Sequence, residues 1–312
     1  MSRSEPRCIT TTTMIEPFFT PFTLPFMATA LTTLLVMVIA AAPTATVMHL
    51  RGMQFATDAL THAVFPGLII GYVVADEPGL LPGALVAAVI ASALISVAAA
   101  RRPGHTDAVT AVVLSSAFGL GMMLISKRLV SGTTPLENLL FGQVLAIRGE
   151  TAVIVIVASV LVWAVSLVTW RSQVFTAFDP VGARAAGMNS PTLQLAFGAQ
   201  LAVLAVAASV TMGTLLAVAL LILPIAAARL VTNRLSRLPV LTAALGVAIV
   251  WLGLGLNFSV SVGTGLRLPG GGTVVLVAIA VYLVCVLIAL LRGALQRRLA
   301  PRATKLASEV TA

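Results

Sequence analysis

Charged residues are scarce in this sequence: Asp, Glu, Lys and Arg make up only 9% of its 312 residues. A typical soluble domain carries about a quarter charged residues. A chain of this length with so few charges cannot cover a water-facing surface, which excludes a soluble enzyme. Aromatic residues are also few, at 5%. The alternating polar and apolar segments of about ten residues that build an outer-membrane barrel are missing as well.

Cysteine is nearly absent, and the motifs of nucleotide-binding and hydrolytic enzymes are missing. Cys8 lies in a polar leader and Cys285 in an apolar run, so neither a disulfide framework nor a thiolate metal site is expected. No G-x-x-x-x-G-K-[ST] segment occurs, nor does H-E-x-x-H or G-x-S-x-G. The chain is therefore not expected to bind a nucleotide, to hold a cofactor of its own or to act as an enzyme.

Apolar residues dominate instead: 59% of the chain is hydrophobic and the mean hydropathy is +1.07. A helix needs about 20 apolar residues to cross the hydrocarbon core of a bilayer. Nine runs meet or approach this length: residues 24–48, 54–75, 80–100, 108–126, 151–170, 193–211, 213–230, 239–257 and 273–292. The seventh run contains Pro224, and a break there would leave eight full crossings. The expected fold is all-α, a polytopic transmembrane helical bundle with eight to nine spans.

Composition divides the chain into three segments. Residues 1–20 form a polar, Thr-rich leader that is expected to be poorly ordered. Residues 21–292 form the transmembrane domain, without an obvious internal repeat. Residues 293–312 form a basic tail.

The basic residues predict the orientation, because Lys and Arg are enriched in cytoplasmic loops. If the runs alternate across the membrane, one side holds Arg51, Arg101, Arg102, Arg171, Arg184, Arg229, Arg234, Arg237, Arg292, Arg297, Arg298, Arg302 and Lys305. The other side holds at most Arg3, Arg7, Lys127, Arg128, Arg148 and Arg267. The C-terminus is therefore expected in the cytoplasm. The enrichment of Lys and Arg in cytoplasmic loops accounts for the net charge of +9. No nucleic-acid partner is therefore expected.

Two ionisable residues interrupt the second apolar run. Asp58 and His62 are four residues apart, so a helix places them on one face, one turn from each other. Asp58 follows Arg51 by seven residues, about 10 Å along a helix, and therefore lies within the hydrocarbon layer. A carboxylate there costs a few kcal/mol or more unless it is paired or hydrated, and such groups mark pathways and binding sites.

One carboxylate and one imidazole suit a divalent first-row metal such as zinc, manganese or iron. Because most such sites need four or more ligands, a symmetric dimer would join two copies of Asp58 and His62 at its axis. The simpler alternative is that the pair only holds the helix bundle together. The neighbouring Thr57 and Thr61 are expected to bond back to helix carbonyls.

Residues 178–188 read FDPVGARAAGM and carry the start and stop signals of a short helix. Asp179 can cap this helix, Pro180 favours its first position, and Gly187 ends it about two turns later. A helix of this size, with Arg184 on it, would form a rigid peg that fits a groove in a partner. The alternative is an amphipathic helix that rests on lipid headgroups.

Five short segments along the chain are informative when they are taken together and in order. They are RGMQFATDALTHAVFPG at 51–67, Phe141, Gly142 and Leu145 of an FG-x-x-L motif, FDPVGARAAG at 178–187, LLILPIAAARLV at 220–231 and PGGGTVVL at 269–276. Together they resemble the permease subunits of metal-ion ABC importers, the family that includes zinc and manganese uptake systems. The chain departs from the family at Gly52 and Thr57, and at Arg267 near the last outer loop.

The resemblance implies an ABC importer permease fold and import of a divalent transition metal, zinc or manganese first and iron next. It implies a separate cytoplasmic ATPase, an extracytoplasmic metal-binding protein and a second permease copy that completes a homodimer in the bacterial cytoplasmic membrane. The transported metal would meet Asp58 and His62. The ATPase-coupling helix would comprise Phe178, Asp179, Pro180, Ala183, Arg184 and Gly187.

Three other functions compete with this hypothesis. A secondary cation/proton transporter would use Asp58 and His62 as a proton relay, but it leaves the FDP-x-x-AR-x-x-G segment without a role. A membrane scaffold leaves the buried Asp/His pair without a role. A siderophore or vitamin importer usually has a longer chain with ten spans. The choice of metal stays open, because oxygen and nitrogen ligands accept zinc, manganese and ferrous iron alike.

Overall fold

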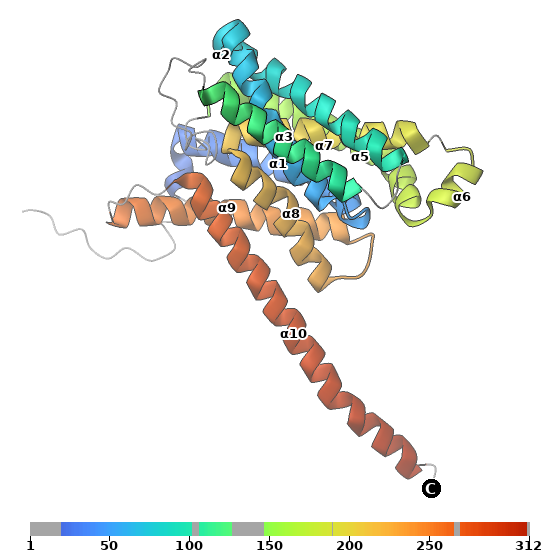
Figure 1. Ribbon diagram of the computed structural model, residues 1–312. Coiled ribbons are helices and arrows are strands. Elements are labelled where there is room, and N and C mark those ends of the chain that lie inside the picture. The colour runs from blue at the N-terminus through green and yellow to red at the C-terminus, as the bar shows by residue number, and fades with distance from the viewer. Residues whose placement is uncertain (1–19, 102–105, 127–146, 189, 265–268, 311–312) are drawn as a thin grey trace, which may run out of the picture.

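The computed structural model describes residues 20–101, 106–126, 147–188, 190–264 and 269–310, and all the regular structure within them is helical (Figure 1). The elements are η2 (Thr20–Thr23), α1 (Pro25–Leu50), α2 (Gln54–Arg101), α3 (Thr106–Ser126), α5 (Gly149–Phe178), α6 (Pro180–Ala185), α7 (Ser190–Met212), α8 (Thr214–Val231), α9 (Leu238–Thr264) and α10 (Gly270–Val310). Several residues of the sequence predictions lie outside the described ranges: the leader up to residue 19, Arg102, Lys127, Arg128, Phe141, Gly142, Leu145 and Arg267.

Nine helical segments within the described residues are long and apolar enough to cross a membrane. They coincide with the nine apolar runs to within a few residues, so the predicted all-α bundle is confirmed. α2 supplies two of the segments, Gln54–Asp76 and Pro78–Ala98. α10 continues as a helix beyond residue 292, where the membrane domain was expected to give way to the basic tail.

The seventh span is not broken at Pro224. α8 is one continuous helix with Pro224 buried in its interior. Neighbouring helices and local adjustments can satisfy the backbone groups that a proline frees in a membrane helix, and Pro224 packs near Gly246 of α9. The chain turns instead at Gly213, between α7 and α8, where φ is 78° and glycine is favoured.

The two halves of α2 form a tight antiparallel hairpin that fixes the position of the first half. The helix is interrupted at Ala75 and Asp76, which have non-helical backbone angles. Below this turn Gly67 faces Gly83, and Gly71 faces Gly79, so closely that a Cβ on any of the four would meet the backbone carbonyl of its partner. Small residues allow this approach of two membrane helices.

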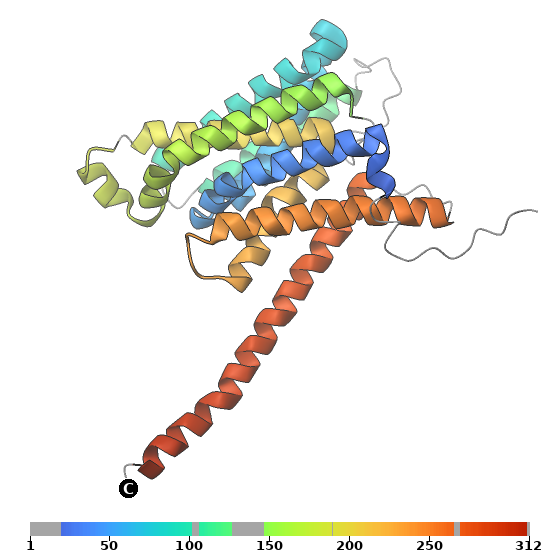
Figure 2. The same cartoon turned by 180° about the vertical axis from the view of Figure 1, so that it is seen from behind.

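Loops that the basic residues assign to one side of the membrane lie at one end of the bundle. In Figures 1 and 2, α6, the α1–α2 turn and the α8–α9 turn gather at that end, and the hairpin turn of α2 lies at the other. The C-terminal part of α10 extends away from the remaining helices. This arrangement agrees with the alternation of nine spans.

α1 is the central helix and connects two apolar cores. It packs chiefly against α5 and α9, while α2 packs against α3 and α7. One core includes Met27, Leu34, Met37, Met212, Leu216 and Ile249, and the other includes Met48, Leu60, Ile95, Phe197 and Leu201. Many apolar residues of α5 and α10 are exposed, as expected for surfaces in contact with lipid.

Candidate functional site

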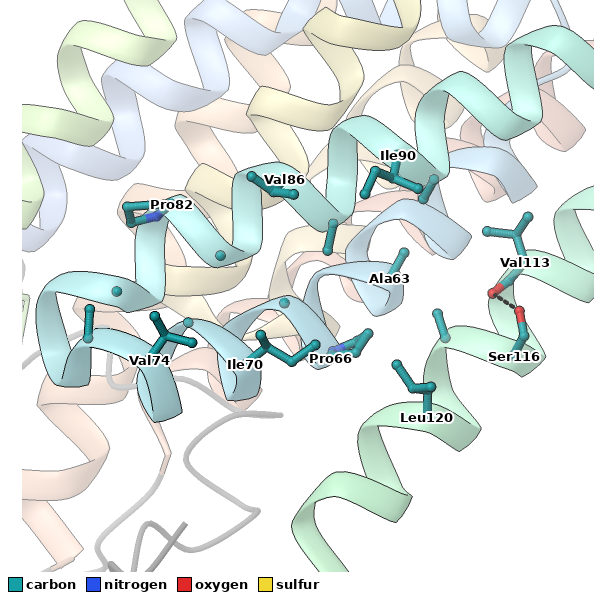
Figure 3. A pocket seen from close by; sticks show the side chains of 18 of the residues that line it. Ala63, Pro66, Ile70, Val74, Pro82, Val86, Ile90, Val113, Ser116 and Leu120 are labelled. Carbon is teal, nitrogen blue, oxygen red and sulfur yellow. Dashed lines mark hydrogen bonds between the residues drawn. The ribbon is translucent and has the colours of Figure 1, made fainter. Parts of the chain in front are cut away.

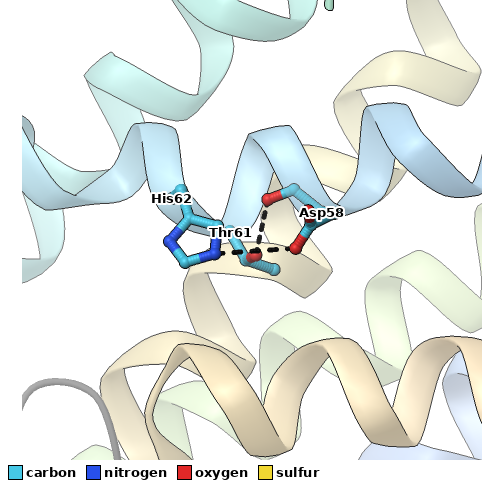
Figure 4. Close-up of polar contacts among 3 residues, drawn as sticks. All are labelled: Asp58, Thr61 and His62. Atoms are coloured by element: carbon cyan, nitrogen blue, oxygen red, sulfur yellow. Dashed lines mark hydrogen bonds and ion pairs between the residues drawn. The ribbon is translucent and has the colours of Figure 1, made fainter. Parts of the chain in front are cut away.

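Asp58 and His62 lie together on the first half of α2, as their spacing predicts (Figure 4). The distance between His62 Nε2 and Asp58 Oδ1 is 3.5 Å. The side chain of His62 is 19% exposed and that of Asp58 is 32% exposed. The contact is loose, and it leaves room for a third group to bind both side chains.

The threonines beside the pair are engaged with the helix. Thr61 Oγ1 donates to the carbonyl of Asp58 at 2.8 Å (Figure 4). Thr57 Oγ1 lies 3.4 Å from the carbonyl of Met53 and 2.8 Å from the sulfur of Met48. The predicted back-bonding is confirmed, so these hydroxyls are occupied and do not extend the Asp/His pair.

One nitrogen of the pair is unsatisfied. His62 Nδ1 is buried, and no described group forms a hydrogen bond with it. The ring meets Phe118 of α3 edge-on, with centroids 6.0 Å apart. A buried polar atom without a partner costs about 1–3 kcal/mol.

The pair lies on a partly exposed stretch of α2. Both side chains are partly exposed, and Phe55, about one turn before Asp58, is 38% exposed. After the pair the helix is buried, from Ala63 to Ile69. A chain surrounded by lipid would therefore present a carboxylate to hydrocarbon, at a cost of a few kcal/mol or more. A second protein surface, or water between two such surfaces, removes this conflict.

An apolar cavity of about 680 Å³ begins beside the pair. It lies between the two halves of α2 and α3, and Ala63, Pro66, Val86 and Leu120 are among its lining residues (Figure 3). Its lining is almost entirely hydrocarbon. The hydroxyl of Ser116 is held by the carbonyls of its own helix. The side chains that line this cavity therefore offer no free ligand for an ion.

A single chain supplies too few ligands for a complete metal site. No group of three or more His, Cys, Asp or Glu side chains that could hold a metal occurs among the described residues. Asp58 and His62 alone are therefore too few to complete a metal site of four ligands.

The predicted short helix is present as α6. The carboxylate of Asp179 accepts a hydrogen bond from Gly182 N at 2.7 Å, and Pro180 occupies the first position. The helix ends in a Schellman motif, with Gly187 at a φ of 78° and its N–H donating to the carbonyl of Arg184. The helix spans Pro180–Ala185, just under two turns, and Gly187 follows its C-cap Ala186 as the sequence predicts.

α6 has one anchoring side and one exposed side. Ala183 is fully buried, whereas Phe178 and Val181 are 66% and 67% exposed. Arg184 is exposed as well, and its Nε donates to the carbonyl of Pro180 at 3.1 Å. Large apolar side chains that protrude from a short capped helix are suited to a protein groove.

Arg51 makes contacts between helices that the sequence did not reveal. It counted only as one positive charge in a loop, yet it is half-buried and contacts two distant helices. Its guanidinium reaches Thr176 of α5 and Phe197 of α7. These residues are more than 120 positions away in the chain, so no local pattern could have revealed the contacts.

Comparison with known proteins gives concordant matches. Residues 23–289 match the model of the ABC 3 transport family. The manganese transport system membrane protein MntC of Listeria monocytogenes is 33% identical over 204 residues, which are 65% of this chain and 71% of that protein. The manganese import system permease protein ScaB of Streptococcus parasanguinis is 31% identical over 228 residues, 73% and 80% of the two chains. The structure of PsaBC from Streptococcus pneumoniae in complex with Fab superposes with a TM-score of 0.74 at 27% identity, over 87% of this chain and 95% of that chain.

Proposed function

Since this chain belongs to the ABC 3 transport family and is a membrane permease of the metal ABC transporter type, we propose that it imports a divalent transition metal ion through a site built by Asp58 and His62. Manganese is the first candidate. The observation that carries the proposal is the position of this partly exposed pair within a membrane-spanning helix.

The depth of the pair supports a transport role. Asp58 lies four residues into α2, about 6 Å along the helix axis, and His62 lies about 12 Å along it. An ion that passes along this face meets a carboxylate first from one end and an imidazole first from the other. Charge at this depth replaces part of the hydration shell that a divalent ion loses on leaving water.

A second copy of the chain is proposed to cover the partly exposed Asp58 and His62. Two chains related by a two-fold axis would offer two carboxylates and two imidazoles, one pair from each Asp58 and His62. The donor set contains oxygen and nitrogen and no thiolate, which suits manganese as well as zinc and ferrous iron. Manganese is placed first because the similar proteins MntC and ScaB bear it in their names.

The energy for import is proposed to come from a separate ATPase that docks on α6. The proposed coupling segment comprises Phe178, Asp179, Pro180, Ala183, Arg184 and Gly187, of which Ala183 is buried and anchors α6. The side of the bundle that carries α6 is then cytoplasmic, together with the C-terminus, and the opposite side receives the metal from an extracytoplasmic binding protein. The membrane is the bacterial cytoplasmic membrane.

Uptake of radioactive manganese by proteoliposomes tests the proposal. The vesicles contain the permease with its ATPase and its binding protein, with and without ATP. Wild type should import the metal only with ATP, and Asp58→Asn, which keeps the shape and removes the charge, should import none. Asp107→Asn is the matched control, because Asp107 is exposed at the start of α3.

Two results would count against the proposal. Undiminished uptake by Asp58→Asn at equal protein levels would remove the pair from the pathway. Uptake driven by a proton gradient without ATP would support secondary transport instead.

A further inference from the structure

Arg51 sits at the tight turn that joins α1 to α2. It is the residue that ends α1, with a φ of −86° and a ψ of −5°. Gly52 follows with a φ of 66°, in the left-handed region that glycine tolerates, and α2 begins two residues later. Any displacement of the Arg51 side chain therefore acts close to the first turn of the helix that carries Asp58.

The side chain of Arg51 crosses from this turn to two other helices. Its Nη2 donates to Thr176 Oγ1 at 2.9 Å and to the carbonyl of Gln173 at 3.5 Å, both on α5. Its guanidinium carbon lies 4.6 Å above the ring of Phe197 on α7. Phe197 is fully buried, so the guanidinium rests on a rigid surface.

The charge of Arg51 is held without an acidic partner. Among the described residues the Asp58–His62 pair is the one contact of salt-bridge length, and it does not involve Arg51. Burial lowers the pKa of Arg51 to about 10, so the group remains a cation at neutral pH. The carbonyl end of α5 and the face of Phe197 stabilise it, through the helix dipole and a cation–π contact.

The contact on α5 lies directly beside α6. Thr176 is in the last turn of α5, which ends at Phe178. Asp179 then joins the two helices: its N–H donates to the carbonyl of Phe175 at 2.9 Å, and its carboxylate caps α6. Because this junction contains a single residue that is bonded on both sides, a shift of α6 moves the last turn of α5 with it.

We propose that Arg51 is a positioning residue that couples α6 to the Asp58–His62 pair. When α6 moves, the last turn of α5 pulls the guanidinium through Thr176, and the α1–α2 turn carries this movement into α2. The inference rests on the proposed function, since it assigns a partner ATPase to α6. The competing role is a structural staple that joins α1, α5 and α7 without transmitting movement.

The two roles differ in what a variant loses. Arg51→Met keeps an unbranched apolar side chain and removes the charge and the donors. Thr176→Val removes the acceptor while preserving shape. Arg171→Met is the control, because Arg171 is an exposed cation on α5, the helix that carries Thr176. Metal import and ATP hydrolysis are measured in the same proteoliposomes, with the thermal stability of each purified complex alongside.

For Arg51→Met we expect the metal imported per ATP hydrolysed to fall about tenfold, within the range typical of coupling between two sites. ATP hydrolysis and thermal stability should be retained. Thr176→Val should lower the same ratio less, and the double variant should be no worse than Arg51→Met, because the two residues act through one contact. Arg171→Met should behave as wild type.

Three results would overturn the inference. The first is an unchanged ratio in Arg51→Met. The second is a loss of import and hydrolysis in equal proportion together with lower stability, which is the signature of a staple. The third applies if the Arg51→Met complex does not assemble: it is an unchanged amount of metal imported per ATP hydrolysed in Thr176→Val. A wild-type complex that imports no metal with ATP would instead refute the proposed function itself.

Discussion

Replacing Gly71 by alanine is expected to force the two halves of α2 apart. The added Cβ would meet the carbonyl oxygen of Gly79, and it would lie 2.9 Å from the carbonyl carbon of Gly79 and 3.2 Å from Gly83 Cα. Carbon atoms pack at about 3.5–4.0 Å, so the hairpin must open by several tenths of an ångström. Such overpacking costs about 1–3 kcal/mol.

Thermal denaturation of the purified permease in detergent measures this loss. Gly119→Ala is the matched control, because Gly119 lies in a membrane-spanning helix with nothing within 4 Å of the new Cβ, and alanine favours a helix by up to about 1 kcal/mol over glycine. We expect Gly71→Ala to unfold at a lower temperature than wild type and Gly119→Ala to match or exceed wild type. Equal stability of the two variants would refute the close packing of the α2 hairpin.

A further prediction concerns α6, the proposed docking site of the ATPase. Ala185 is the last residue of α6 and Ala186 is its C-cap, and both are exposed. Ala185→Trp and Ala186→Trp should prevent co-purification of the ATPase while the permease still inserts into the membrane. Full retention of the ATPase by both variants would show that α6 is not the docking site.

The sequence predicts those parts of the molecule whose causes are local. A membrane span depends on the length of one apolar run, so nine spans follow from nine runs. α6 depends on Asp179, Pro180 and Gly187, which lie within nine residues of one another. The shared face of Asp58 and His62 depends only on the period of a helix.

The sequence does not predict features that arise from packing between distant segments. Pro224 does not break α8, because neighbouring helices decide whether a proline disrupts a membrane helix. The contacts of Arg51 with Thr176 and Phe197 join three helices that are far apart in the chain. The unsatisfied Nδ1 of His62 also becomes visible only when α2 and α3 are packed together.

The central claim is that two chains share one metal ion between their Asp58 and His62 side chains. Titration of the purified permease with Mn²⁺, followed by the loss of the paramagnetic signal of the hydrated ion, measures both affinity and stoichiometry. We predict one bound Mn²⁺ per two wild-type chains and no binding at the same concentrations for Asp58→Asn or His62→Gln. One ion bound per chain, or undiminished binding by either variant, would contradict the claim.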